Sequence, residues 1–227
     1  MAADLNLEEE LKSKEFRVAI FGSARPKPGE PVYQAAYKLA KNIADLDVDV
    51  ITGGGPGIME AASLGHKNGG TDNNSHSIGI NIKLPFEQSV NPGVEVMDEH
   101  ERFSTRLDEF MLLANAAVIM PGGIGTALEL FYTWQLIQVN HICKIPLILV
   151  GDMWRDLIYW VIDHQLKGKY ISPDDLNSVI CVKDVDEAFE VLKDAKKAFD
   201  EQGPDVCLNW EKYGEKFNGE LDESDKD

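Results

Sequence analysis

Short apolar runs alternate with helical patterns along most of this chain. Runs rich in β-branched and aliphatic residues lie at 16–21, 48–51, 77–82, 116–120, 146–150 and 179–182. Such runs suit strands that are buried on both faces of a sheet. Between them, apolar side chains recur at helical spacing over residues 32–43, 107–114 and 131–139. The alternation predicts an α/β fold: a doubly wound parallel sheet with helices on both faces, in three α/β/α layers.

The two ends of the chain differ from its middle. The chain has 227 residues, and at roughly 100–200 residues per domain we expect a single domain, which we place at residues 16–200. Residues 1–15 form an acidic N-terminal extension in which three leucines would allow a short helix. Residues 201–227 end in ELDESDKD and are expected to be a partly disordered acidic extension.

Charge and cysteine content narrow the classes of partner. The formal net charge of −17 argues against sequence-independent binding to nucleic acid or to an anionic membrane, because both need clustered cations. A few backbone amides can still hold an anionic small molecule. Cys143, Cys181 and Cys207 show no metal-like spacing, so we expect free thiols in a reducing compartment. No signal peptide or membrane-spanning run is visible, which predicts a cytoplasmic protein.

Three glycine turns follow strands of the predicted sheet. Gly22-Ser23 comes after the first run, TGGGPGIME (residues 52–60) after the second, and PGGIGTALE (residues 121–129) after the fourth. Glycine lets backbone N–H groups approach an anion closely, and the following helix adds unpaired donors and a positive dipole end. Since ligands of such sheets bind at the carboxyl ends of the strands, the three turns predict a phosphate site. Tight strand-to-helix turns are the simpler alternative, and neither GxGxxG nor GxxxxGK[ST] occurs.

Two charged residues near these turns have structural alternatives. Thr126 and Glu129 have capping-box spacing, in which the glutamate would bond back to the threonine amide. Arg106 has Asp108 and Glu109 nearby and could form a surface ion pair. None of the five histidines has the sequence spacing of a metal-binding pair or a catalytic triad, so we expect no metal site.

The segment TGGGPGIME followed by PGGIGTxxE resembles the LOG ("Lonely Guy") family of Rossmann-like phosphoribohydrolases. The resemblance covers about residues 16–165 and implies that Arg106, fifteen residues before Pro121, and Glu129 form the catalytic pair. Cytokinin-activating members carry a histidine two residues before this arginine and a lysine after it, where this chain has Ser104 and Leu107. The resemblance therefore leaves the preferred base open.

The resemblance implies hydrolysis of a nucleoside 5′-monophosphate, of the AMP or cytokinin riboside type, to free base and ribose 5-phosphate. It also implies a homodimer or higher oligomer and no cofactor. The nucleotide would be held by Gly22, Ser23, Gly54, Gly55, Gly57, Met59, Gly122, Gly123, Gly125 and Thr126. The alternative is a non-catalytic carrier of a nucleotide or of molybdenum cofactor on the same fold. Relatives are often labelled lysine decarboxylases, but nothing marks Lys83, the one lysine in a strand-like context near a loop, as a Schiff-base lysine.

Overall fold

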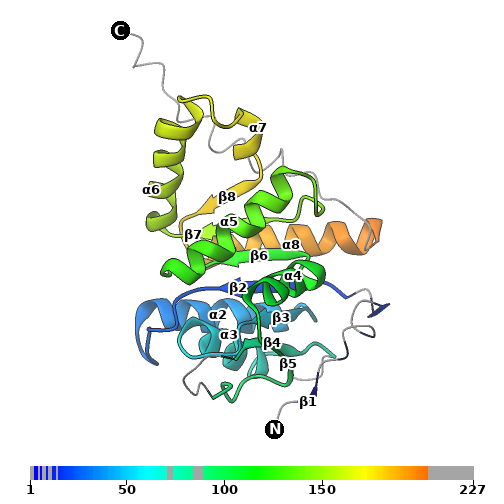
Figure 1. Ribbon diagram of the computed structural model, residues 1–227. Coiled ribbons are helices and arrows are strands. Elements are labelled where there is room, and N and C mark those ends of the chain that lie inside the picture. Colours follow the sequence, from blue (N-terminus) through cyan, green and yellow to red (C-terminus); the bar gives the residue numbers. More distant parts are fainter. Residues whose placement is uncertain are drawn as a thin grey trace.

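A single parallel sheet organises the protein (Figure 1). The computed structural model describes residues 3–4, 6, 9, 12–13, 15–70, 74–83 and 89–203. Across the sheet the strands run in the order β1 (Ala3–Asp4), β5 (Val96–His100), β4 (Ser77–Ile82), β3 (Asp49–Thr52), β2 (Arg17–Phe21), β6 (Ala116–Ile119), β7 (Leu147–Val150) and β8 (Val179–Val182). All neighbouring pairs are parallel. The order reverses between β2 and β6, and this is where ligands of doubly wound sheets bind.

Helices cover both faces of the sheet. One layer comprises α2 (Pro31–Ala44), α3 (Ile58–Lys67) and α8 (Val185–Gln202), and the other comprises α4 (Phe103–Leu113), α5 (Ile124–Gln138) and α6 (Asp152–Trp160). A π-helical segment, Val161–Leu166, continues α6, and the short α7 spans Pro173–Leu176. The predicted three-layer α/β/α architecture is therefore confirmed.

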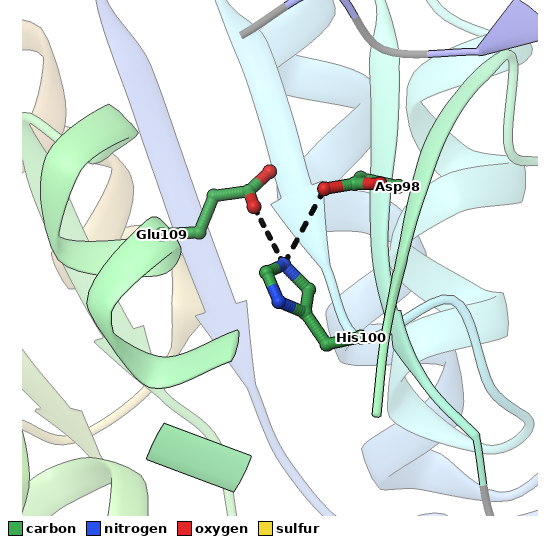
Figure 2. A group of neighbouring side chains, drawn as sticks. All are labelled: Asp98, His100 and Glu109. Carbon is green, nitrogen blue, oxygen red and sulfur yellow. Dashed lines mark hydrogen bonds and ion pairs between the residues drawn. The ribbon is translucent and has the colours of Figure 1, made fainter. Parts of the chain in front are cut away.

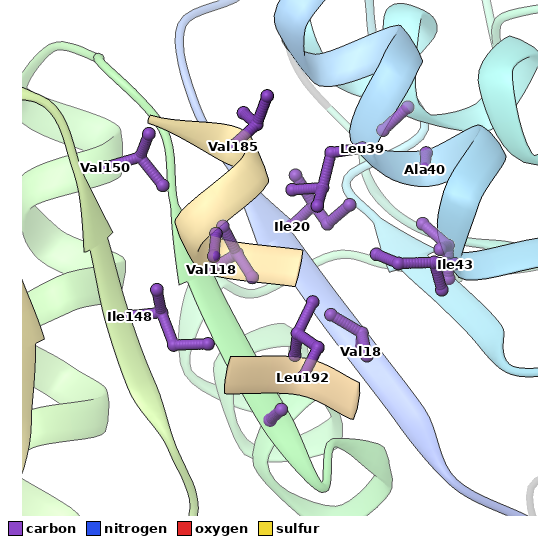
Figure 3. Packing of buried hydrophobic residues seen from close by; sticks show 14 of the residues in the cluster. Val18, Ile20, Leu39, Ala40, Ile43, Val118, Ile148, Val150, Val185 and Leu192 are labelled. Atoms are coloured by element: carbon purple, nitrogen blue, oxygen red, sulfur yellow. The ribbon is translucent and has the colours of Figure 1, made fainter. Parts of the chain in front are cut away.

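Alternation along the strands divides the core into two halves. In β2, Val18 and Ile20 point into the half under α2, α3 and α8, whereas Ala19 and Phe21 point into the half under α4, α5 and α6. Figure 3 shows the first half, where Leu39 of α2 and Leu192 of α8 meet the strand side chains. Because both faces are buried, every residue of β2, β3, β4, β6 and β7 is buried.

The structure contains elements that the sequence patterns did not indicate. The strand β5 reads VMDEH and is only half-buried, so it lacks the apolar run that marks a central strand. It pairs with Ala3–Asp4, which brings part of the expected N-terminal extension into the sheet. The helix α8 was also missed, although Asp184 caps it by accepting from the amides of Asp186 and Glu187. Of the expected C-terminal extension, residues 201–227, the first two belong to α8, and residues 204–227 lie outside the described residues.

The cysteines differ from one another. Cys143 is disulfide-bonded, so the expectation of a free thiol is wrong at this position. Cys181 is free and half-buried in β8, and burial raises the pKa of its thiol to about 12. Cys207 lies outside the described residues. Within those residues, no helix has both the length and the apolar character needed to cross a bilayer.

The turn before α3 depends on one glycine. Gly57 has φ 72°, and a Cβ placed there would overlap the carbonyl oxygen of Ser23. With ψ −126° this backbone conformation is one that L residues rarely adopt, so we expect Gly57→Ala to cost on the order of 1–3 kcal/mol for the conformation and a further amount for the overlap. Gly29→Ala is the matched control, because Gly29 has φ 95° but open space around it. Equal losses in chemical denaturation would show that the contact with Ser23 contributes nothing.

Candidate functional site

A cavity of about 760 Å³ opens at the carboxyl ends of the central strands, beside the switch between β2 and β6. Its wall is formed by residues of the three glycine turns, of β4 and of α4 and α5. The lining residues are Ile20–Pro26, Val32, Gly53, Gly55, Met59, Asn81, Ile82, Phe103, Arg106, Pro121–Thr126 and Glu129. The sequence-based expectation that three turns converge on one site is met by this arrangement.

Backbone hydrogen bonds join the three turns directly. The Ser23 amide donates to the carbonyl of Pro121 over 3.2 Å, and the Ile58 amide donates to the carbonyl of Ser23 over 2.9 Å. The turn after β2 is thus bonded to the turns after β3 and β6. These two bonds link residues about 35 and 100 positions apart, so the shape of the cavity depends on the sheet order and not on any one motif.

Most of the residues expected to bind nucleotide line this cavity. They are Gly22, Ser23, Gly55, Met59, Gly122, Gly123, Gly125 and Thr126, together with the expected catalytic residues Arg106 and Glu129. Gly54 and Gly57 do not line it. The Gly54 amide instead donates to the Thr52 hydroxyl over 3.1 Å, and Gly57 allows the close approach of two turns.

The sequence analysis missed other residues of the wall. Arg25, Asn81, Phe103 and Ile124 all line the cavity. Asn81 lies near the end of β4, and Phe103 and Ile124 are the first residues of α4 and α5. Their positions directly after or at the carboxyl ends of strands are the signal that would have identified them.

The helix α5 begins earlier than the capping-box spacing suggested. Its first residue is Ile124 and its N-cap is Gly123, without a side-chain cap. Thr126 is therefore the third helical residue, and the interpretation of Thr126 and Glu129 as a capping box is wrong. Glu129 lies in the second turn of the helix, and its carboxylate is available to the cavity.

Arg106 is held by three different contacts. Its Nε donates to the carbonyl oxygen of Ile80 over 2.8 Å, and its guanidinium carbon lies 5.4 Å from the centre of the Phe110 ring. Its Nη1 is 4.0 Å from Oε1 of Glu129. The side chain is only 10% exposed, and burial lowers the pKa of the guanidinium while Glu129 opposes that shift.

The alternative surface pair for Arg106 does not form. Asp108 accepts a hydrogen bond from the Tyr132 hydroxyl, and Glu109 contacts His100 with 2.5 Å between Oε2 and Nε2. Arg106 instead points to the sheet and to Glu129. The interpretation as a surface ion pair is therefore wrong.

Glu129 is a buried carboxylate whose charge Arg106 only partly stabilises. Its side chain is 14% exposed. Loss of solvent raises its pKa to about 7, and the nearby Arg106 charge only partly offsets this effect. At 4.0 Å the two groups are too far apart for a hydrogen bond, so each keeps capacity for a third partner in the cavity. A carboxyl group that titrates near neutrality suits proton transfer or charge stabilisation.

The amino end of α5 lines the same cavity as this pair. Gly123 and Gly125 line the cavity, and a Cβ at either position would meet nothing within 4 Å. The first amides of a helix lack partners within the helix and carry the positive end of its dipole. The cavity therefore brings together the amino end of a helix, a buried arginine and a buried carboxylate.

Comparison with known proteins identifies the family of this chain. Residues 50–213 match the family described as "Possible lysine decarboxylase". This chain belongs to that family, the LOG family. A cytokinin riboside 5′-monophosphate phosphoribohydrolase from Arabidopsis thaliana is 29% identical over 85% of the chain and 88% of its own length. A pyrimidine/purine nucleotide 5′-monophosphate nucleosidase from Escherichia coli K12 is 31% identical over 54% of the chain and 28% of its own length.

Solved structures of the same fold include carriers. The molybdenum cofactor binding protein of Rippkaea orientalis matches with TM-score 0.59 and 22% identity over 79% of this chain and 96% of its own. The molybdenum cofactor carrier protein of Chlamydomonas reinhardtii matches with TM-score 0.58 and 21% identity over 81% and 99%. At these identities the likeness establishes the Rossmann-like LOG-type fold alone.

The raised pKa of Glu129 makes a prediction about stability. In the unfolded chain this carboxyl titrates near 4.5 and in the folded protein near 7, so between these values only the folded state keeps the proton. The free energy of unfolding therefore falls as pH rises through this window. Because glutamine mimics the protonated form, Glu129→Gln should be more stable than the parent at pH 8, by on the order of 1–3 kcal/mol.

Denaturation of both proteins at pH 4 and pH 8 measures this difference, which should vanish at pH 4. Glu190→Gln is the control, since Glu190 forms an exposed pair with Lys193 and its loss should change stability by less than about 1 kcal/mol at either pH. A Glu129→Gln protein less stable than the parent at pH 8 would contradict the assignment of a costly buried carboxylate.

Proposed function

We propose that this protein hydrolyses the N-glycosidic bond of a nucleoside 5′-monophosphate and releases the free base and ribose 5-phosphate. The observation that carries the proposal is the pair of Arg106 and Glu129, buried 4.0 Å apart in the wall of a cavity. The relatives named above as a phosphoribohydrolase and a nucleotide nucleosidase support the same reaction.

The 5′-phosphate is assigned to the amino end of α5. Gly122, Gly123, Gly125 and Thr126 line the cavity there. Backbone amides at the start of a helix bind phosphate without a lysine, which suits a site in a strongly acidic chain. Gly55, from the turn after β3, lines the same cavity.

The reaction places positive charge on the ribose ring as the bond to the base breaks. Ionised Glu129 next to C1′ stabilises this charge and orients the attacking water. Water supplies the hydroxyl group at C1′ of the sugar and, in total, one proton to the departing base. Arg106 stays protonated and acts as a hydrogen-bond donor to the substrate or to Glu129.

The base is assigned to the apolar part of the cavity. Met59, Phe103 and Ile124 line it, and the last two side chains are 54% and 89% exposed in the protomer. These surfaces suit the flat face of a nucleobase. Because Ser104 and Leu107 replace the histidine and lysine of cytokinin-activating enzymes, we propose AMP as the first substrate to test and cytokinin riboside monophosphates as the second.

A non-catalytic carrier is the second candidate. It is favoured by the similar folds of the molybdenum cofactor binding and carrier proteins. A carrier of nucleotide or of molybdenum cofactor would use the same helix end but would not need a carboxylate at the sugar. Glu129, buried at a cost in the cavity wall, therefore favours the enzyme.

Decarboxylation of lysine is not favoured by the site. Pyridoxal phosphate chemistry requires a lysine for the Schiff base, and no lysine is among the described residues that line the cavity. Lys83 is exposed, and its amide is bonded to the carbonyl of His100.

We also propose that the reaction uses no cofactor and that the protein is cytoplasmic.

Substitution of Glu129 tests the enzyme directly. Glu129→Gln keeps the size and the helix but removes the negative charge, so release of base from AMP and from a panel of nucleoside monophosphates should fall by roughly 10²-fold or more. Chromatography of the released base and thermal melting are measured together. Glu190→Gln should keep the parent's turnover.

Two outcomes would reject this proposal. If Glu129→Gln keeps more than about half of the parent's turnover, Glu129 does not stabilise the reacting sugar. If the parent binds nucleotides but releases no base, the protein is a carrier. Arg106→Ala should also lose turnover, because it removes the only side chain shown to pair with Glu129 within the described residues.

We also propose a homodimer or a higher oligomer formed through α4 and α5. Both helices bury part of their apolar surface in the core, but Ile124, Leu128 and Phe131 lie on one face of α5 and are 89%, 46% and 41% exposed. Leu112 of α4 is 59% exposed. An exposed apolar stripe of this kind marks a protein interface.

Charge placed in this stripe should dissociate the oligomer. Phe131→Glu should lower the mass measured by light scattering at micromolar concentration to that of one chain, whereas Tyr170→Glu should not. Tyr170 is 82% exposed and follows the π-helical segment, away from α5 in sequence. A parent that is monomeric under these conditions would refute the proposed interface.

A further inference from the structure

Three ligating side chains meet outside the cavity, between β5 and α4 (Figure 2). Asp98 and His100 come from β5 and Glu109 comes from α4, and their three ligand atoms all lie within 4.8 Å of one another. Nε2 of His100 is 3.4 Å from Oδ2 of Asp98 and 2.5 Å from Oε2 of Glu109. None of the three lines the cavity, so this cluster is separate from the proposed active site.

The Thr105 hydroxyl determines the tautomer of the neutral His100 ring. It leaves unprotonated the ring nitrogen that faces the two carboxylates. The Thr105 hydroxyl donates to the carbonyl of Arg102 over 3.0 Å. A hydroxyl has one proton, so Thr105 accepts from Nδ1 of His100, which is 2.9 Å away. In the neutral ring Nε2 then carries a lone pair, directed at two carboxylates. The 2.5 Å contact between Nε2 of His100 and Oε2 of Glu109 is a hydrogen bond, so a proton lies between these atoms in the metal-free protein. A metal ion would displace that proton and leave three electron-rich atoms directed at one point.

Burial adds a second, independent observation. The side chain of Glu109 is only 5% exposed, and its Oε1 is a buried atom with no hydrogen-bond partner among the described residues. Figure 2 shows the Glu109 carboxylate directed at the His100 ring. A buried carboxylate oxygen without a partner is costly, and coordination of a metal ion by this carboxylate would remove the cost.

We propose that Asp98, His100 and Glu109 bind a divalent transition-metal ion. One imidazole nitrogen and two carboxylates are a ligand set used for zinc and for similar borderline ions. Thr105 serves as the outer partner that orients the histidine, as is usual for metal-bound histidines. The three ligands leave at least one coordination position, on the side of Asp98, whose side chain is 42% exposed.

The geometry needs one adjustment. Ligand distances of 2.0–2.2 Å in a tetrahedral site separate the ligand atoms by roughly 3.3 Å. The separation of 3.4 Å between His100 and Asp98 already meets this value, whereas Glu109 must move away from Nε2 by somewhat less than about 1 Å. The ion would then join β5 to α4, the helix that carries Arg106.

Calorimetric titration with Zn²⁺ tests the proposal. The sample is the full chain, depleted of metal and without an affinity tag that contains histidines. We expect one saturable site per chain and a melting temperature that rises with Zn²⁺ concentration. Substitution of Zn²⁺ by Co²⁺ should produce visible absorption bands that report coordination by nitrogen and oxygen. His100→Ala and Asp98→Asn should each weaken binding by at least about 10-fold.

Matched variants separate this site from surface binding. His141→Ala removes an exposed histidine elsewhere in the chain, and Glu99→Gln removes an exposed acid that lies next to Asp98 and His100 in sequence. Both variants should bind Zn²⁺ as tightly as the parent does. Asp98 is half-exposed, so the Asp98→Asn protein should fold normally. This variant therefore tests the metal site even if the Glu109→Gln protein does not fold. The proposal is overturned if the parent shows no saturable binding, or if Asp98→Asn and His100→Ala bind Zn²⁺ as tightly as the parent.

Discussion

The hydrogen bond from Arg106 to the carbonyl of Ile80 positions the arginine of the proposed active site. A buried guanidinium must satisfy its donors, and here Nε donates to a carbonyl within β4 over 2.8 Å. The bond, together with the Phe110 ring, holds the plane of the guanidinium while Nη1 stays 4.0 Å from Glu129. Gly53 is part of the same arrangement, because a Cβ there would overlap Nη2 of Arg106. The arginine is therefore placed by the sheet and not by its acidic partner.

This placement explains the unusual state of Glu129. If Arg106 were free to close the gap, a tight ion pair would form and keep the carboxyl strongly acidic. Anchored at 4.0 Å, the arginine offsets only part of the cost of burial, and the pKa of Glu129 remains near 7. The protein thus keeps a carboxylate that is expensive to ionise where a positively charged sugar would benefit most from it. Stability is given up locally at the point where the proposed reaction needs charge.

The central strands could be predicted from the sequence because their apolar residues follow one another with few interruptions. In β2, β6 and β7 every residue is buried, so an apolar run alone identifies each strand. The edge strand β5 could not be recognised in this way, since VMDEH is half-buried and polar. The cluster of Asp98, His100 and Glu109 was missed for the same reason. Asp98 and His100 share a face only once residues 96–100 are known to be a strand, and Glu109 joins them only through the packing of α4.

The start of α5 shows where spacing alone misleads. Thr126 and Glu129 have the separation of a capping box, yet the helix begins two residues before Thr126, and the turn is closed by Gly123. Moving the start by this amount changes the role of Glu129, because a carboxylate in the second turn no longer caps an amide. At 1.5 Å per residue, Glu129 lies about 7.5 Å along the axis from Ile124. In the proposed function, a phosphate on the first amides of α5 would place the sugar of the same nucleotide alongside Glu129. One helix would then both bind the anion and supply the carboxylate, with the separation between the two set by helical geometry.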